Sequence, residues 1–493
     1  MDNCFNNSNN NSSSLPPGAG RAQRGLFGKG GWAVVCAVVG LLAPLKADPP
    51  PARPYSITHY DVVVQPDLAK HLILGAVTIS LTALSEGLSH IELDAADITV
   101  LGASEGKVHL RYVLADDILR IDLPRALHAS QHAELRIVYR ASPTRGVAFF
   151  KDQLYTAFAT SHWLPCNDRP DDRATFRLVV IVPDHLQVVA SGESVHESTK
   201  NGQRTSEWRE DRPIPTFVFG FAAGVFRFES RRAGKTQLVL ALPERAAEPE
   251  PHAQPSGGSG TEPSKSPQAE EQTSKADSDK LSSRILDETQ AALGFFEENG
   301  GVRYPADRYT TVFAHGGVMQ EARCFTLLPE DYLAALKKDP DDLWLLAHEL
   351  AHQWWGIGMA GRDWSDFWLN EGIATFMADA FLEHQFGRAR YEKEIARSRK
   401  IFEDAVASGT SRPLHFTHWS QPREAGGPIP YHKGALFLDA LRSRLGDTVF
   451  WRGFQEFTRS HMGQSVTSQE FEASMEKSCH CSLSQIVSEW VYF

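Results

Sequence analysis

The segment from Glu244 to Lys280 separates two regions of the 493-residue chain whose apolar residues repeat with different periods. It contains no large apolar side chain and is rich in Pro, Ser, Glu and Gly. Such a segment cannot bury enough apolar surface to offset the entropy lost on ordering. We therefore predict a disordered linker over residues 244–280. The chain on either side of it is long enough to form a domain of its own.

Residues 54–243, before this segment, have the alternating pattern of β-strands. In the stretch AVTISLTAL, apolar Val77, Ile79 and Leu81 alternate with Thr and Ser, which places the apolar side chains on one face of a strand. The stretches ELRIVYR and TFRLVVIVP repeat the pattern, and clusters of Gly, Pro or Asp separate the runs. Many short strands without intervening helical periods predict an N-terminal antiparallel β sandwich or saddle.

Residues 281–493, after the segment, have a helical period, which predicts a mainly α domain. The stretch DPDDLWLLAHELAHQWWG has Asp341 as a candidate N-cap and ends at Gly356. Two further helices are predicted over residues 366–386 and 431–445, each followed by a glycine. The buried stripe of the first helix follows i, i+3, i+4, i+7 spacing and is predicted to comprise Leu343, Leu346, Ala347, Leu350 and Trp354.

The N-terminus has the pattern of a secretory signal. Basic Arg21, Arg24 and Lys29 precede the apolar stretch GWAVVCAVVGLLAPL, and Ala47 follows before a Pro-rich segment. The apolar stretch is shorter than the ~20 residues that span a bilayer comfortably. Residues 1–47 are therefore predicted to be a signal peptide or an uncleaved N-terminal anchor. We expect an exported protein that is periplasmic, secreted or attached to a membrane through this segment.

Charge and cysteine content disfavour several other classes of protein. A formal net charge of −11 disfavours nucleic acid as a partner, because phosphate binding requires a surplus of Lys and Arg. The 6 cysteines are too few and too unevenly placed to form a disulfide framework. Cys479 and Cys481 flank His480, but no second ligand pair has metal-site spacing. We interpret these two cysteines as half-buried thiols or as one disulfide.

The sequence HELAH places His348 and His352 four residues apart on a predicted helix, with Glu349 directly after the first histidine. Positions i and i+4 share a helix face, so both imidazoles can point at one metal ion. Glu371, in FWLNEGIATF on the next predicted helix, supplies a third ligand. Two His and one Glu leave the fourth zinc position open for water, which is typical of a catalytic site. We therefore predict one Zn²⁺ per chain, with Glu349 as the general base of a metallopeptidase.

These motifs resemble the zinc signature of the gluzincin aminopeptidases, the family of aminopeptidase N and the leukotriene-hydrolysing epoxide hydrolase. The resemblance rests on HELAHQWWG and DWSDFWLNEGIATF, and extends to YDVVVQPD, HWLPCNDRPDDRATFRLVV and YHKGALFLDALR. It implies a β domain followed by a thermolysin-like zinc peptidase domain that removes N-terminal residues from peptides. It also implies that the Tyr431 hydroxyl hydrogen-bonds the oxyanion of the reaction intermediate. The helical-repeat domain of larger members is not expected here, which predicts a more open cleft that admits longer peptides.

The substrate-binding residues depart from the pattern of that family. Its N-terminus-specific members carry a Gly-x-Met-Glu-Asn strand whose glutamate pairs with the α-ammonium of the substrate. Aligning HGGVMQEARCF on Gly317 and Met319 places Gln320 at the position of that acid and Glu321 one residue later. Gln supplies no charge, and neighbouring strand residues point to opposite faces, so Glu321 could replace it only through a bulge or a one-residue shift. Thr156 is a second departure, since the family usually has a substrate-contacting Gln there.

Two other functions remain open beside a zinc aminopeptidase. One is a zinc peptidase with the same machinery and altered N-terminus recognition, either an endopeptidase or an enzyme that accepts blocked N-termini. The other is a non-catalytic scaffold, which the presence of all zinc ligands together with Glu349 and Tyr431 argues against. The side-chain preference at the first residue of the substrate, the physiological substrate and the oligomeric state do not follow from the sequence.

Overall fold

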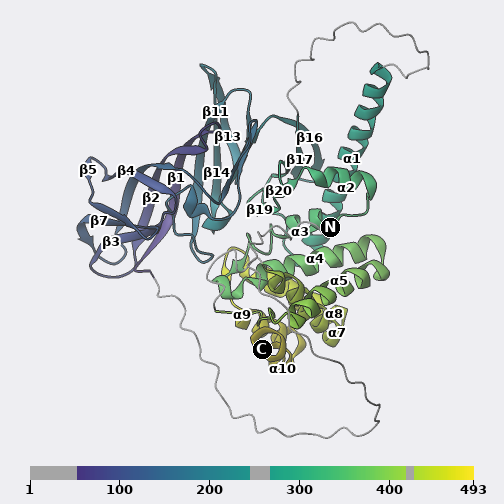
Figure 1. Cartoon of the computed structure of the whole chain (residues 1–493). Helices are drawn as coiled ribbons and strands as arrows, with labels where there is room; N and C mark the ends of the chain where they lie inside the picture. The colour runs from purple at the N-terminus through teal and green to yellow at the C-terminus, as the bar shows by residue number, and fades with distance from the viewer. Residues whose placement is uncertain (1–52, 245–266, 418–426) are drawn as a thin grey trace, which may run out of the picture. The chain divides into compact units, whose positions relative to one another are not determined.

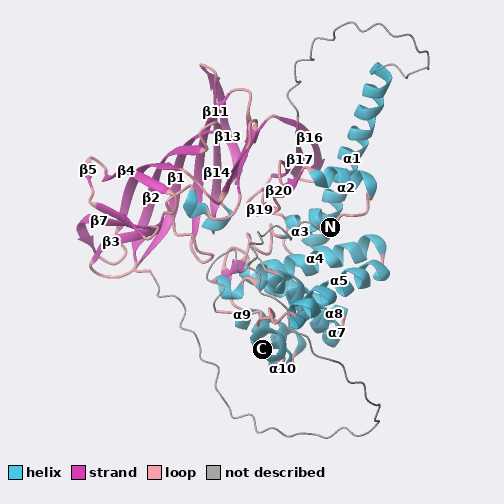
Figure 2. Cartoon of the chain, in the orientation of Figure 1, coloured by secondary structure: helices cyan, strands magenta, loops and turns pink. Residues whose placement is uncertain are grey.

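The computed structural model describes residues 53–244, 267–417 and 427–493 of the chain. These residues belong to one compact unit, Arg53–Phe493, whose strands come first and whose helices follow (Figure 1, Figure 2). The predicted signal segment, residues 1–47, lies outside the described residues. None of the helices in the described ranges combines the length and the apolar character needed to span a bilayer.

An eight-stranded sheet forms the frame of the N-terminal β domain. Val62 of one central strand lies opposite Leu178 in a parallel pair, and the other neighbouring strands pair antiparallel. The predicted antiparallel architecture is therefore corrected to a mixed sheet, because a long crossover separates the two parallel strands in sequence. In sheet order the strands are β13 (Glu193–Lys200), β14 (Gln203–Pro215), β11 (Arg173–Pro183), β1 (Tyr55–Asp67), β2 (Leu72–Ala83), β8 (His132–Ala141), β4 (Ile98–Glu105) and β5 (Val108–His109).

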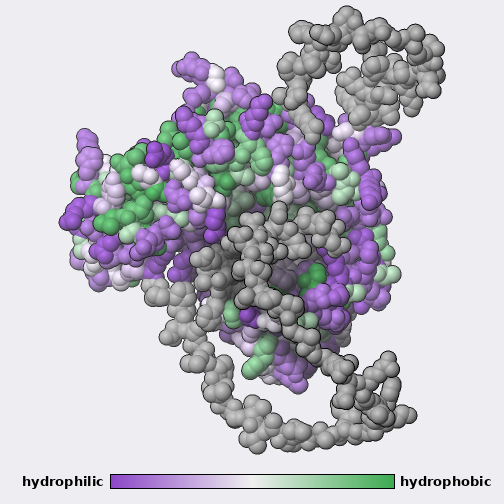
Figure 3. All heavy atoms as spheres, in the orientation of Figure 1, coloured by the Kyte–Doolittle hydropathy of each residue, from purple (hydrophilic) through white to green (hydrophobic). Residues whose placement is uncertain are grey.

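Two smaller sheets complete the β domain. Buried side chains from all three sheets form one apolar core, in which the predicted inward residues Val77, Ile79 and Leu81 are fully buried. Leu74 and Val138 are exposed on the eight-stranded sheet, and Figure 3 shows hydrophobic patches over the strands of this domain. The smaller sheets are β3 (Leu88–Asp94), β7 (Ile118–Leu127) and β6 (Tyr112–Ala115), and β12 (Gln187–Ala190), β15 (Phe221–Gly224), β10 (Gln153–Thr156) and β9 (Val147–Phe149).

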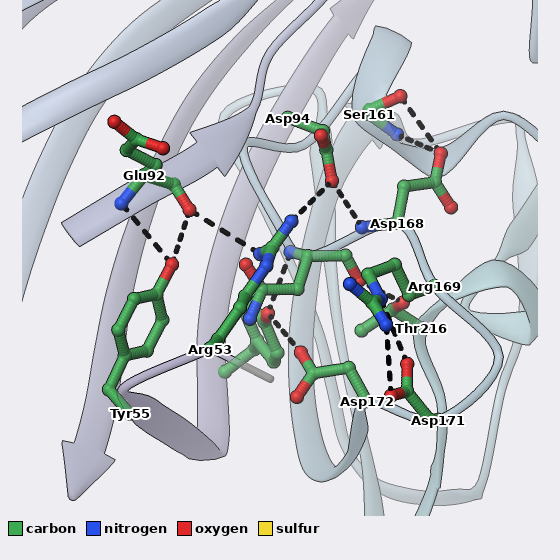
Figure 4. A network of polar contacts seen from close by, with 12 residues as sticks. Arg53, Tyr55, Glu92, Asp94, Ser161, Asp168, Arg169, Asp171, Asp172 and Thr216 are labelled. Atoms are coloured by element: carbon green, nitrogen blue, oxygen red, sulfur yellow. Dashed lines mark hydrogen bonds and ion pairs between the residues drawn. The ribbon is translucent and has the colours of Figure 1, made fainter. Parts of the chain in front are cut away.

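A polar network holds the loop that leads into β11 (Figure 4). Asp94, at the end of β3, accepts hydrogen bonds from Arg53 at 3.4 Å and from the backbone N–H of Asp168 at 2.9 Å. Asp168 in turn accepts from the backbone N–H and the hydroxyl of Ser161, at 3.0 and 2.8 Å. Asp172 accepts a hydrogen bond from Tyr60, and burial raises the pKa of its carboxyl to about 7. These bonds fix the approach to Arg173, the first residue of β11.

A five-stranded sheet begins the second domain, and two of its strands come from the region predicted to be the β domain. Its order is β16 (Phe226–Ala233), β17 (Thr236–Pro243), β18 (Arg308–Ala314), β20 (Phe325–Pro329) and β19 (Gln320–Ala322). The pairs β17–β18 and β18–β20 are parallel, and β19–β20 is antiparallel. The predicted boundary at Pro243 is therefore corrected, because an alternating pattern predicts a strand but does not specify the sheet that the strand joins.

The predicted linker over residues 244–280 is also corrected at its C-terminal end. Helix α1 spans Pro267–Gly300, so it begins well before Leu281, where the helical period becomes visible in the sequence. Ala, Glu, Gln and Lys are common at its start, and these residues have high intrinsic helix propensity even without an apolar stripe. Residues 245–266 lie outside the described residues.

The remaining helices confirm that the second domain is mainly α. The first predicted helix is shorter than expected at both ends. Leu343 rather than Asp341 is its N-cap, and it ends at Ala351 rather than just before Gly356, although the predicted apolar residues are all buried. The cysteine pair near the C-terminus forms a disulfide, Cys479–Cys481. The helices are α2 (Asp331–Lys338), α3 (Trp344–Ala351), α4 (Trp368–Phe386), α5 (Arg388–Ala407), α7 (Gly434–Leu445), α8 (Asp447–His461), α9 (Ser468–Cys479) and α10 (Ser484–Val487).

Candidate metal and peptide site

Two adjacent helices bring the three predicted metal ligands together. His348 lies on the last turn of α3 and His352 is its C-cap residue, while Glu371 lies on the first turn of α4. The Nε2 atoms of the two histidines are 3.2 Å apart, and each lies 3.4 Å from Oε2 of Glu371. All three residues are buried, with exposed fractions of 4%, 1% and 1%.

The spacing of these three atoms fits a zinc ion. A tetrahedral ion with bonds of 2.0–2.1 Å holds its ligand atoms roughly 3.3 Å apart, which matches the separations of 3.2 and 3.4 Å. Two imidazoles and one carboxylate are also the donor set of catalytic zinc sites. The three residues therefore form a candidate zinc site.

Second contacts orient both imidazole rings. His352 Nδ1 lies 3.0 Å from the backbone oxygen of Trp355, so a proton on Nδ1 would leave the Nε2 lone pair free for a metal. The ring of His348 stacks on that of Trp344, with centroids 4.8 Å apart. Trp344 is held in turn by its indole N–H, which donates to Asp379 at 2.8 Å. These contacts hold the two imidazole rings in place before any metal binds.

Glu349 and Glu321 form a second buried group, which shares His352 with the metal ligands. Ligand atoms of Glu321, Glu349 and His352 all lie within 4.8 Å of one another. Glu321 pairs with Thr326 across the β19–β20 hairpin, and the Thr326 hydroxyl lies 3.4 Å from Oε2 of Glu349. Residues paired across two strands share a face, so Glu321 faces Glu349.

Gln320 is buried beside Glu321 rather than in its place. Its side-chain amide donates to Oε2 and to the backbone oxygen of Glu321, both at 2.8 Å. The Glu321 carboxylate thus lies beside Glu349 and His352, and the Gln320 amide is hydrogen-bonded to it.

Three buried carboxyl groups around two imidazoles give the site a strong demand for positive charge. Burial and the neighbouring carboxylates raise the pKa of Glu321 to about 7 and the pKa of Glu349 well above its usual value. Burial opposes protonation of His352, but the carboxylates of Glu371, Glu321 and Glu349 outweigh it and raise its pKa to about 10. Burial favours the neutral form of Glu371, but the charge of His352 and two imidazole hydrogen bonds lower the pKa of the carboxyl to about 2. A divalent cation would satisfy the same demand without a proton.

Tyr431 approaches the metal ligands from a third element, the wide turn Ile429–Lys433 that precedes α7. Its ring stacks on His348 with centroids 5.9 Å apart. Burial and the carboxylates of Glu371, Glu321 and Glu349 raise its pKa well above the usual value. The phenol therefore stays protonated at neutral pH and can donate a hydrogen bond.

Three of the predicted substrate-binding residues do not point to the metal ligands. The Thr156 hydroxyl is engaged with the backbone of Phe221, accepting from its N–H at 2.9 Å and lying 3.3 Å from its oxygen. Gly317 is exposed, and Met319 is 42% exposed at the surface. Within the described residues, no hydrogen bond joins the Thr156 side chain to His348, Glu349, His352 or Glu371.

Sequence reasoning missed Gln353, which ties the metal-binding helix to the β19–β20 hairpin. It is fully buried, accepts from the backbone N–H of Cys324 at 3.1 Å and donates to the backbone oxygen of Ala322 at 2.9 Å. The available signal was its position, since a polar residue directly after His352 in an otherwise apolar run needs a hydrogen-bond partner inside the protein.

Comparison with protein families identifies both halves of the chain. Residues 284–490 match the family described as Peptidase family M1 domain, and residues 56–218 match the Peptidase M1 N-terminal domain. The two matches together span most of the chain. A crystal structure of an M1 zinc metallopeptidase from Deinococcus radiodurans has the same fold, with a TM-score of 0.70 and 24% identity over 89% of this chain and 94% of that one.

The curated relatives are much longer than this chain. "Probable aminopeptidase 2" of Sulfurisphaera tokodaii is 24% identical over 352 residues, which cover 68% of this chain and 41% of the relative. "Leucine aminopeptidase 2" of Aspergillus oryzae is 28% identical over 322 residues, which cover 63% of this chain and 46% of the relative. The chain thus spans less than half the length of these curated relatives.

Proposed function

The chain belongs to the peptidase M1 family, and from this premise we propose that it is a zinc-dependent aminopeptidase that hydrolyses N-terminal residues from peptides. The observation that carries the proposal is the position of Glu321. Its carboxylate lies with Glu349 and His352 in one buried cluster, adjacent to the metal ligands. A negative group at that place supports recognition of a free α-ammonium next to the bond that is cut.

The residues divide the reaction between them. His348, His352 and Glu371 would hold a zinc ion, which supplies Lewis acidity to the scissile carbonyl and to water. Glu349 accepts the proton of the attacking water and delivers it to the leaving amine. The Tyr431 phenol donates a hydrogen bond to the oxygen that becomes negative. Glu321 binds the substrate ammonium and thereby sets the cut one residue from the N-terminus.

A matched pair of peptides tests this function. A free-amine peptide and its N-acetylated form differ only in the charge that Glu321 would bind, so we expect kcat/KM for the acetylated peptide to be lower by about 10- to 100-fold. Mass spectrometry of the products over time should show loss of one residue at a time. Equal cleavage of both peptides would instead favour the alternative function, an endopeptidase or an enzyme that accepts blocked N-termini.

We also propose that the protein is exported, which the basic, apolar and small-residue pattern of residues 1–47 supports. Expression of the full chain in a secreting host should give a mature protein outside the cytoplasm. N-terminal sequencing should then begin at or near Asp48, since Ala47 is the small residue before the predicted cleavage point. An uncleaved anchor would give an intact chain in the membrane fraction, whereas an intact chain in the cytosol would contradict export.

A further inference from the structure

The hairpin that carries Glu321 has a tight turn of two residues, Arg323 and Cys324. Ala322 pairs with Phe325 across this turn, and Cys324 has a φ of 68°. The left-handed backbone conformation costs free energy for a non-glycine residue, so surrounding contacts must hold Cys324 in it. The position of Glu321 therefore depends on what holds the hairpin.

Two separate parts of the chain form hydrogen bonds to this turn. From the turn that follows α3, Gln353 bonds the backbone on both sides of Arg323, at Ala322 and Cys324. From the β domain, Glu210 on β14 accepts a hydrogen bond from Nε of Arg323 at 2.6 Å. The exposed fractions of Arg323 and Glu210 are 3% and 6%, so this ion pair is sealed from solvent.

The β domain also forms hydrogen bonds to the segment that precedes the hairpin. On β10, Tyr155 donates from its hydroxyl to the backbone oxygen of His315 at 2.9 Å. The side-chain oxygen of Gln153 accepts from the backbone N–H of His315 at 2.6 Å. Residues 315–323 are therefore fastened to the β domain at both ends, with Glu321 between the two attachments.

The attachment at Arg323 is an ion pair with Glu210, so it depends on the charges of both side chains. Arg323 also accepts a backbone hydrogen bond at its carbonyl, from the N–H of Gly192 at 3.3 Å. Burial disfavours a charged guanidinium, but Cys324 and Glu210 beside it favour that form and raise its pKa. A second buried arginine, Arg173, donates instead to the backbone oxygens of Ile357 and Gly358. Among the described residues, Glu210 is the one carboxylate paired with Arg323.

We propose that Glu210 and Arg323 are a positioning pair that holds Glu321 in place for the ammonium of the substrate. The β domain supplies no metal ligand, yet through this pair it governs recognition of the N-terminus. The inference rests on the proposed aminopeptidase function, but the order of the hairpin can be measured without any substrate. Removal of the Glu210 charge leaves a buried guanidinium without its counter-ion and loosens the turn.

Glu210→Gln tests the pair, because it keeps the shape of the side chain and removes its charge. We expect KM for a free-amine peptide to rise about tenfold with little change in kcat, because a small displacement of a positioned group is enough. The preference for free-amine over N-acetylated peptide should fall, while zinc content stays unchanged. Glu207→Gln is the matched control, since Glu207 lies on the same strand and pairs with Arg177 on the exposed face. We expect Glu207→Gln to leave both KM and the preference for free-amine peptide unchanged.

Hydrogen exchange of the zinc-loaded protein gives the readout that is independent of turnover. In Glu210→Gln we expect faster exchange across residues 320–325 and unchanged exchange across α3. Unchanged exchange in the hairpin, or an increase spread evenly over the whole domain, would overturn the proposal whatever the enzyme hydrolyses. If Glu210→Gln does not fold, Arg323→Lys is measured in the same way, because it keeps the charge and loses the guanidinium geometry. A wild-type enzyme indifferent to acetylation would refute the proposed function and leave this exchange result as the test of positioning.

Discussion

Replacement of Glu349 with Gln is expected to lower kcat for peptide hydrolysis by about 10³-fold or more, the range of a lost general base. The amide has the shape of the carboxylate but cannot take a proton from water. His348, His352 and Glu371 are untouched, so zinc content measured by elemental analysis should stay at one ion per chain. KM should change little, because Glu349 acts on the attacking water and not on the ground-state peptide.

A second substitution at the same position separates chemistry from structure. Glu349→Asp keeps a carboxylate but shortens the side chain by one methylene. The activity of this variant should therefore lie between those of the wild type and Glu349→Gln. Melting temperatures of both variants should be close to that of the wild type when zinc is bound. Unchanged hydrolysis in Glu349→Gln would remove the general-base assignment. Loss of zinc in that variant would show that Glu349 also supports the metal.

The elements that the sequence predicts well are those whose patterns are local. The stripe from Leu343 to Trp354 follows the helical period, and every member that was predicted to be buried is buried. The metal ligands were predictable for the same reason, since His348 and His352 are fixed on one helix face by their spacing and Glu371 begins the next helix. Glycines after α4 and α7 also mark the ends of these helices, as predicted.

The features that the sequence did not reveal depend on contacts between distant residues. Strands β16 and β17 alternate like those of the β domain, but their hydrogen bonds go to β18. The register of Glu321 is set by its pairing with Thr326 in the hairpin, and not by its distance from Gly317 and Met319. The pairing of Glu210 with Arg323 joins residues far apart in the chain, and no spacing in the sequence indicates it.

Glu321→Gln is expected to lower kcat/KM for free-amine peptides by about 10- to 150-fold, with most of the loss in KM. The estimate follows from a charge-assisted hydrogen bond, which contributes about 1.5–3 kcal/mol. Hydrolysis of the N-acetylated peptide should hardly change, because that substrate has no ammonium to lose. The ratio of the two rates should therefore approach one.

Gln320→Ala is the matched comparison for this variant. Gln320 donates to Glu321 at 2.8 Å, so its removal frees the carboxylate but leaves the charge in the cluster. We expect a loss of only a few-fold, since one neutral donor to a charged acceptor is removed and the substrate ammonium can replace it. A larger loss in Gln320→Ala than in Glu321→Gln would assign the anchor to Gln320, in agreement with the alignment of the sequence motif. We expect the opposite order, because the Glu321 carboxylate lies beside Glu349 and His352 and the Gln320 amide donates a hydrogen bond to it.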